Sequence, residues 1–367
     1  MIAYTTGFID HILETACRIQ QIAAPTFDES RRAAWVMEQF RVLNLANVNM
    51  DAAGNVLGCW PGTGSAAPLV ISAHLDTVFP LEVPLTLTRQ DDRISGPGIG
   101  DNSLGVAAVL GLAELLKTQA LRFPGDIWLV ATTGEEGLGN LRGIQAVVER
   151  FEGRPQAYIS LEGHGLGTIL HRGLGVERLR VTARAQGGHS WVDYGRPSAI
   201  HQLMRLGSRV ASTRVPATPR TTLNIGRVEG GTSINTIASE AWMEIDLRSE
   251  GAKALERLKT RVNRRLASIT EGVDIEVQVV GRRPAGEIPP THPLVAAAQA
   301  TLADLGITAR LDIASTDANI PLSLGYPAVT LGLTGGGRAH TVDEFIEIPP
   351  FQKGFRQIVN LVERLAA

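Results

Sequence analysis

Residues 69–80 read LVISAHLDTVFP, an apolar run that leads directly to His74 and Asp76. A short apolar run of this kind predicts a strand over residues 69–73 that is buried on both faces. Similar apolar runs at residues 127–132 and 157–161 predict two more buried strands. Apolar residues recur at helical spacing over residues 8–22 and 106–118, which predicts two helices. This alternation of strands and helices predicts an α/β sheet with helices on both of its faces.

The strand and helix pattern changes between residues 173 and 285. There the predicted order is βαββαβ, which can fold by itself as a ferredoxin-like α+β sandwich. The predicted elements cover residues 176–185, 198–211, 221–228, 241–248, 252–268 and 274–281. At 367 residues the chain is long enough for two domains. Because the first pattern returns after this segment, we predict that residues 173–285 are inserted into a domain formed by residues 1–172 and 286–367.

Composition and charge exclude several classes of protein. Hydrophobic residues make up 44% of the chain and charged residues 20%, as in a folded globular protein. A net charge of -2 provides no basic field for nucleic acid. The first residues do not form a signal peptide, and no stretch reaches the roughly 18 apolar residues of a membrane span. Only Cys17 and Cys59 are present, too few for a disulfide framework or a cysteine zinc site. We predict a soluble cytoplasmic protein that binds neither nucleic acid nor membranes.

Polar side chains follow the predicted strands of the first domain, where open α/β sheets bind their ligands. His74 and Asp76 are two residues apart and point to the same side, so Asp76 can hold the second imidazole nitrogen of His74. Glu135 and Glu136 are adjacent and diverge, so one can bind a metal while the other faces a substrate. The remaining candidates are Asp101 in GPGIGDNSLG, Glu162 after the strand at 157–161, and His340 in TGGGRAHTVDE.

Charge balance predicts that this group holds metal ions. Taken singly, each residue is most simply a polar cap at the end of a strand. Together, the carboxylates of Asp101, Glu136 and Glu162 would be crowded at a high electrostatic cost without a cation. Two Zn²⁺ ions and a bridging hydroxide would make the group neutral, with His74 and His340 as further ligands. Cobalt or manganese could fill the same nitrogen and oxygen sites.

The order of these motifs resembles a known family over nearly the whole chain. HLDTV, GDNSLG, GEEGLG, the glutamate of SLEG, GGHSW, GGTSIN, DLR and AHTVDE occur in this order. They are similar to the co-catalytic zinc family of tripeptidase T, acetylornithine deacetylase, succinyl-diaminopimelate desuccinylase, aminoacylase and carboxypeptidase G. The resemblance implies a zinc-exopeptidase-like mixed sheet flanked by helices. It also implies that His74 and Glu162 bind one zinc, that Glu136 and His340 bind the other, and that Asp101 bridges them.

The same resemblance assigns catalytic roles. It implies that Asp76 orients His74 and that Glu135 is the general base. In this hypothesis a metal-bound hydroxide attacks an amide carbonyl and Glu135 returns the proton to the leaving amine. His164 lies two residues past Glu162, but its flanking glycines favour a surface turn.

The inserted segment resembles the lid and dimerisation domain of the family. By this resemblance the chain forms a homodimer, and His189 stabilises the oxyanion in its own or the partner subunit's site. Asn235 and Arg248 would contact the substrate, with Arg248 pairing with a carboxylate. Gly336, within the run 335–337, would offer backbone groups to the substrate.

The predicted function is therefore a zinc-dependent exopeptidase that cleaves an amide bond in small peptides. Many deacylases of the family have a lysine soon after the bridging aspartate, whereas Ser103 and Leu104 stand here, which favours the tripeptidase branch. The alternative is a deacylase of N-acyl amino acids, and a more distant one is an inactive binding protein with the same fold. A dinucleotide site is disfavoured because the glycine-rich loops lack the G-x-G-x-x-G spacing, and a serine hydrolase because no G-x-S-x-G motif occurs in the chain.

Overall fold

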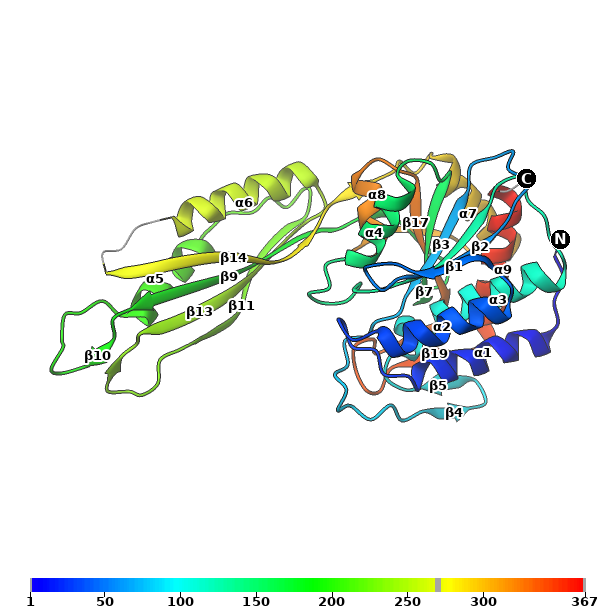
Figure 1. Ribbon diagram of the computed structural model, residues 1–367. Helices are drawn as coiled ribbons and strands as arrows, with labels where there is room; N and C mark the ends of the chain where they lie inside the picture. Colours follow the sequence, from blue (N-terminus) through cyan, green and yellow to red (C-terminus); the bar gives the residue numbers. More distant parts are fainter. Residues whose placement is uncertain (1, 268–271, 366–367) are drawn as a thin grey trace. The chain divides into compact units, whose positions relative to one another are not determined.

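Two units of the chain each have a hydrophobic core of their own. Unit 1 comprises residues 1–173 and 287–367, and unit 2, the inserted unit, comprises residues 174–286. The computed structural model describes residues 2–267 and 272–365 (Figure 1). Residue 268, at the end of a predicted helix, lies outside the described residues. The two units are described one after the other.

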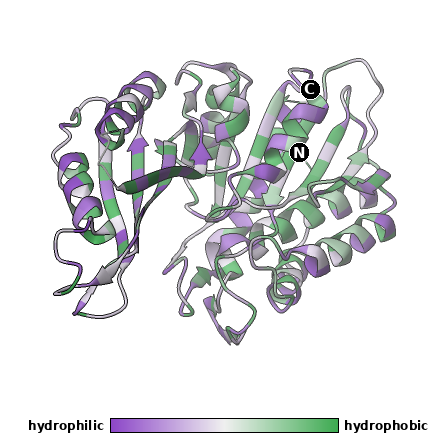
Figure 2. Ribbon diagram, turned by 60° about the vertical axis from the view of Figure 1, so that its left-hand side comes forward, coloured by the Kyte–Doolittle hydropathy of each residue, from purple (hydrophilic) through white to green (hydrophobic). Residues whose placement is uncertain are grey.

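Unit 1 is built on a nine-stranded sheet with the strand order β1-β2-β6-β3-β7-β17-β8-β15, in which β16 also pairs with β8. The central strands β6, β3, β7 and β17 are parallel to one another, whereas β2 and β8 pair with them in antiparallel fashion. The strands are β1 (Ala46–Met50), β2 (Val56–Trp60), β3 (Leu69–His74), β6 (Ile127–Thr132), β7 (Ala157–His164), β8 (Thr168–Gly173), β15 (Gly286–Glu287), β16 (Arg310–Ala314) and β17 (Ala328–Thr334). Every residue of β3, β6 and β17 is buried, as apolar parallel strands require. The strands of this sheet are mostly hydrophobic in Figure 2.

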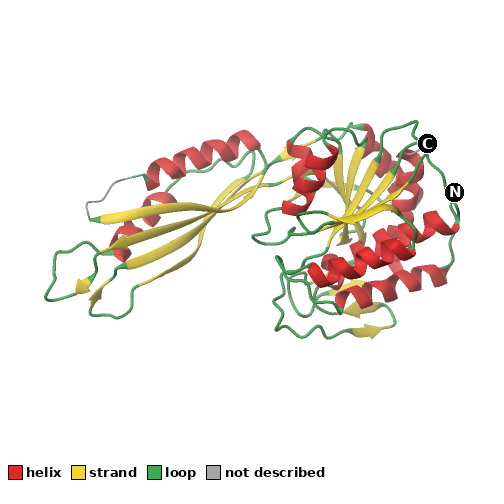
Figure 3. Cartoon of the chain, in the orientation of Figure 1, coloured by secondary structure: helices red, strands yellow, loops and turns green. Residues whose placement is uncertain are grey.

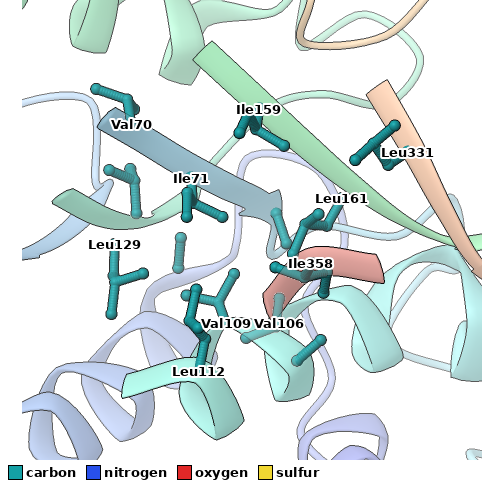
Figure 4. Close-up of a cluster of buried hydrophobic side chains, with 14 of the residues drawn as sticks. Val70, Ile71, Val106, Val109, Leu112, Leu129, Ile159, Leu161, Leu331 and Ile358 are labelled. Atoms are coloured by element: carbon teal, nitrogen blue, oxygen red, sulfur yellow. The ribbon is translucent and has the colours of Figure 1, made fainter. Parts of the chain in front are cut away.

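Helices cover both faces of the large sheet. Figure 4 shows Leu129 of β6 pointing toward Val109 and Leu112 of α3. The neighbouring Trp128 must point to the opposite face, where its ring lies 5.0 Å from that of Phe151 in α4. The helices are α1 (Thr6–Gln20), α2 (Ser30–Val42), α3 (Leu104–Thr118), α4 (Arg142–Phe151), α7 (Pro293–Asp304), α8 (Asn319–Ser323) and α9 (Ile348–Leu365). The predicted α/β class, with a mixed sheet flanked by helices, is confirmed.

A short helical segment, η1 (Ile99–Ser103), runs directly into α3. Together they form Ile99–Thr118, which is long and apolar enough to cross a membrane, contrary to the estimate from the sequence. However, 89% of an apolar 18-residue window in this stretch is buried inside the structure. Its apolar character is that of a core helix, because α3 packs against β3, β6 and β7.

A second, four-stranded sheet in unit 1 lies next to the segment that carries η1. Its strand order is β18-β19-β5-β4. The strands are β4 (Thr88–Gln90), β5 (Arg93–Ser95), β18 (Gly336–Gly337) and β19 (Phe345–Glu347). This sheet joins the loop before η1 to the loop that follows β17, which are far apart in the sequence.

The inserted unit has the order βαββαβ. Its antiparallel sheet has the strand order β11-β13-β9-β14, and both of its helices contact β9 and β13 as well as each other (Figures 1 and 3). The main elements are β9 (Gly175–Ala185), α5 (Ala199–Ala211), β11 (Thr221–Gly230), β13 (Glu240–Ser249), α6 (Ala252–Leu266) and β14 (Val273–Arg283). A small two-stranded antiparallel sheet pairs β10 (Gly188–His189) with β12 (Thr236–Ile237). Burial alternates along β13, so one face of the sheet packs on the helices and the other is polar.

Candidate metal centre

Four neighbouring parallel strands lead the candidate ligands to one edge of the large sheet. In their order across the sheet, β6 precedes Glu136, β3 ends at His74, β7 carries Glu162 and β17 precedes His340. Because the carboxyl ends of parallel strands lie at the same edge, side chains that are distant in the sequence meet there.

Asp101 lies between the two imidazoles. It belongs to η1, where its backbone angles are not helical. Its Oδ1 atom lies 3.0 Å from Nε2 of His74, and its Oδ2 atom lies 3.1 Å from Nε2 of His340. A carboxylate that presents one oxygen to each of two imidazoles has the arrangement needed to bridge two cations.

Two groups of three candidate ligands share Asp101. One contains His74 and Glu162, with 3.6 Å between Nε2 and Oε2. The other contains Glu136 and His340, with 3.2 Å between Oε1 and Nε2. Within each group the ligand atoms all lie within 4.8 Å of one another. Each group offers one nitrogen and two oxygen donors, a set that suits zinc, cobalt or manganese.

Burial and neighbouring charges shift the pKa values of three candidate ligands, Glu162, His340 and His74. Burial raises the pKa of Glu162 to about 7. Hydrogen bonds to Asp101 and Glu136 raise the pKa of His340 to about 10. Burial lowers the pKa of His74, but the surrounding carboxylates outweigh this effect and raise it well above its usual value. Protons on the imidazoles therefore supply the positive charge that this acidic group requires, and divalent cations can replace them.

Asp76 organises the loop that follows β6. Its fully buried carboxylate accepts hydrogen bonds from the backbone N–H groups of Glu135 and Glu136 and from the hydroxyl of Thr26, each at 2.9 Å. The hydrogen-bonding partner of His74 Nδ1 is the backbone oxygen of Asp76 at 3.0 Å, while the carboxylate oxygen lies 3.6 Å away. Burial opposes ionisation of Asp76, but His74 and the two N–H donors hold its pKa below the usual value. Asp76 thus touches His74 mainly through its backbone and fixes the two glutamates through its side chain.

A sequence model described as Peptidase family M20/M25/M40 matches residues 70–364. The chain belongs to this family. A succinyl-diaminopimelate desuccinylase of Corynebacterium glutamicum is 28% identical over 238 residues, which are 63% of this chain and 64% of that protein. A tripeptidase structure from Staphylococcus aureus has a TM-score of 0.81 at 23% identity and covers 98% of both chains. A Bacillus subtilis structure described as a dinuclear metal-binding peptidase of family M20 has a TM-score of 0.71 at 15% identity and covers 99% of both chains. The resemblance found in the sequence is confirmed, and the two structures show that the fold is shared.

Glu135 lies beside the candidate metal ligands. Its side chain is buried, and one carboxylate oxygen lies within 4.8 Å of ligand atoms of His74 and Glu136. The backbone of Glu135 is held by Asp76. A buried carboxylate in this place can take a proton from a water at the centre and release it again.

His189 and Asn235 lie together in the inserted unit. Antiparallel pairing of β10 with β12 brings their segments together, and the backbone N–H of Ser190 donates to the backbone oxygen of Asn235 at 2.9 Å. The Nδ1 atom of His189 accepts from the backbone N–H groups of Trp191 at 3.2 Å and Val192 at 3.4 Å. In a neutral imidazole the proton is therefore on Nε2, which makes that atom a hydrogen-bond donor.

Arg248 is on β13 of the inserted unit. Its Nε atom donates to Oδ2 of Asp246 at 2.6 Å, and the other oxygen of Asp246 accepts from Arg178 at 3.3 Å. The carboxylate of Asp246 therefore orients the Arg248 guanidinium, which is partly exposed.

Neighbouring atoms of unit 1 lie so close to Gly336 that they leave no room for a side chain. A Cβ atom at this position would lie 2.3 Å from the backbone oxygen of Phe345 and 2.5 Å from Nδ1 of His164. The glycine is therefore required by packing, whether or not its backbone also contacts a substrate.

The structure adds residues that the sequence did not single out. Glu29 accepts from the backbone N–H of Gly134 at 3.0 Å and from Arg142 at 2.7 Å, which holds the loop before Glu135. Asp317 is buried, and it accepts from the hydroxyl of Thr132 at the end of β6, at 2.6 Å. Neither Glu29 nor Asp317 directly follows an apolar run, so no local sequence pattern indicates that these residues support the site.

The sequence predicts a surface turn for His164, but His164 itself lies in a strand and the turn begins at the next residue. His164 is the last residue of β7, and its side chain is only 22% exposed. Of the two flanking glycines, Gly165 belongs to a surface turn: it is exposed, and its backbone oxygen accepts from the N–H of Thr168 at 2.9 Å. Gly163 is packed so closely that an added Cβ atom would lie 2.1 Å from the backbone oxygen of Gly100.

Proposed function

We propose that the chain is a two-metal hydrolase that cleaves an amide bond in short peptides. The observation that carries this proposal is the position of Asp101, whose two oxygens lie 3.0 and 3.1 Å from His74 and His340. Glu162 and Glu136 complete the two groups. Membership of a peptidase family supports the same reaction class.

The ligands would be divided between two divalent ions, with His74 and Glu162 on one, Glu136 and His340 on the other, and Asp101 on both. When bound, such ions lower the pKa of water and polarise a carbonyl group. Glu135 accepts a proton from the attacking water and transfers it to the nitrogen of the leaving amine. Zinc is the proposed native metal, and cobalt and manganese suit the same donors.

The inserted unit would supply substrate contacts. The Nε2–H group of His189 would donate to the developing oxyanion, in its own or the partner subunit's site, and the hydrogen bonds to Nδ1 support this tautomer. Arg248 would pair with a substrate carboxylate, for which Asp246 orients it. Asn235 and the backbone of Gly336 would contact the substrate as well.

We also propose a homodimer formed through the inserted unit. Four strongly exposed apolar residues lie in the loop after β10 and the loop before β12: Trp191, Val192, Tyr194 and Ile234. Exposed apolar side chains gathered on neighbouring loops support a protein interface. Analytical ultracentrifugation would show a dimer, and a monomer at micromolar concentration would contradict the proposal. The cytoplasmic location stays a prediction.

A second candidate function is removal of an acyl group from an N-acyl amino acid. The 28% identity to a desuccinylase favours it, and the bond to be cleaved is again an amide. The test is a hydrolysis panel of dipeptides, tripeptides, and N-acetyl and N-succinyl amino acids, measured with zinc, with a chelator, and after zinc is restored. Zinc-dependent cleavage of peptides supports the peptidase, and cleavage confined to acyl amino acids supports the deacylase. No cleavage of any compound with zinc restored would favour an inactive binding protein.

A further inference from the structure

Glu344 is a fully buried carboxylate that none of the roles above uses. It lies four residues after His340, in the loop that leads to β19. Its Oε2 atom accepts from the backbone N–H of Gly98 at 2.8 Å. Its Oε1 atom accepts from the backbone N–H groups of Gly100 at 2.8 Å and Asp101 at 2.7 Å. One side chain therefore satisfies three backbone donors of the loop that carries the bridging aspartate.

The same carboxylate also contacts the strand that carries Glu162. Nε2 of His164, two residues further along β7, lies 3.0 Å from Oε1 of Glu344. A carboxylate only accepts hydrogen bonds, so Nε2 carries the proton in this contact. Glu344 thus connects three segments, each with a metal ligand: η1 with Asp101, the end of β7 with Glu162, and its own loop with His340.

We infer that Glu344 is a positioning residue that sets the spacing of the metal ligands before any ion binds. A buried charge is costly unless donors surround it. Its four donors can converge only when η1 and β7 are in the places seen here. This inference rests on the proposed metal-dependent function, since it concerns the affinity of that centre.

Close packing around Glu344 supports the inference. A Cβ atom on Gly100 would lie 2.2 Å from Nε2 of His164 and 2.9 Å from Oε1 of Glu344. On the opposite side of the imidazole, Gly336 leaves the space that Nδ1 of His164 occupies. Gly100, next to Asp101, and Gly336, near His340, therefore leave the space in which the imidazole of His164 approaches the carboxylate of Glu344.

The test is the zinc affinity of Glu344→Gln, measured by competition with a chromophoric chelator. An amide places an NH₂ group against at least one backbone N–H, so the loop of Asp101 moves. We expect the weaker of the two zinc sites to lose about 10- to 100-fold in affinity, as for other residues that orient metal ligands. The matched control is Glu177→Gln, an equally conservative change at a buried glutamate of the inserted unit that binds Lys259 and Arg282. Both variants should lower the melting temperature in chelator, but only Glu344→Gln should weaken zinc binding.

A second variant keeps the charge. Glu344→Asp is one methylene shorter and cannot reach all four donors, so it should also weaken zinc binding if Glu344→Gln does not fold. Wild-type zinc affinity in the variants that fold would overturn the inference and leave the proposed function intact. A wild-type protein that binds no zinc would overturn both.

Discussion

Replacing Asp76 by asparagine should weaken the loop that carries Glu135 and Glu136 without removing a proposed metal ligand. The carboxylate is fully buried and accepts from the N–H groups of Glu135 and Glu136 and from Thr26, each at 2.9 Å. Asparagine keeps one acceptor oxygen but places an NH₂ group against a donor. We take one charge-assisted bond as lost, at about 1.5–3 kcal/mol, and the others as weakened by about 1–2 kcal/mol together. The charge of Asp76 also favours the charged form of the buried Arg32, whose pKa burial lowers to about 10. The free energy of unfolding should therefore fall by about 3–5 kcal/mol.

The assay is urea unfolding in the presence of a chelator, so that bound metal does not contribute to stability. Thr26→Val is the matched control, because it removes one of the three donors and leaves the charge, and it should cost about 1 kcal/mol. With zinc present, Asp76→Asn should also lower kcat about 10- to 100-fold, because the loop of Glu135 and Glu136 moves. A loss of stability below that of the control would refute the reasoning, as would an unchanged kcat.

Three further predictions concern the metal centre. Glu135→Ala should keep two zinc equivalents by elemental analysis while activity falls about 10²- to 10⁴-fold, and near-normal turnover would remove it as the base. His340→Ala should lose one zinc equivalent, so full occupancy would contradict its assignment as a ligand. Zinc binding at pH 7.5 should release protons, because the pKa of His340 is raised to about 10 in the metal-free chain and its proton must leave. Calorimetry in two buffers of different ionisation enthalpy measures this release, and equal heats would contradict it.

The sequence predicted the core of the fold well because buried parallel strands leave a direct pattern. The apolar runs at 127–132 and 157–161 lie in β6 and β7, and the run at 69–73 lies in β3. Polar residues directly after such runs predict a ligand-binding edge, and the structure brings His74 and Glu162 together there.

The supports of the site could not be predicted in the same way. Glu344 acts through backbone N–H groups more than 240 residues earlier in the chain, and nothing in the neighbouring sequence indicates that contact. The two glycines beside His164 both indicate a turn, yet only Gly165 belongs to one, whereas Gly163 allows the close approach of η1 to β7. Glycine marks both situations in a sequence, and only the tertiary contacts distinguish them.

The most direct test of the account is anomalous diffraction from crystals grown with zinc. We predict two peaks about 3.5–4 Å apart, one beside His74 and Glu162, the other beside His340 and Glu136, with Asp101 between them. A single peak, or two peaks that Asp101 does not join, would contradict the claim that this carboxylate bridges two metal ions.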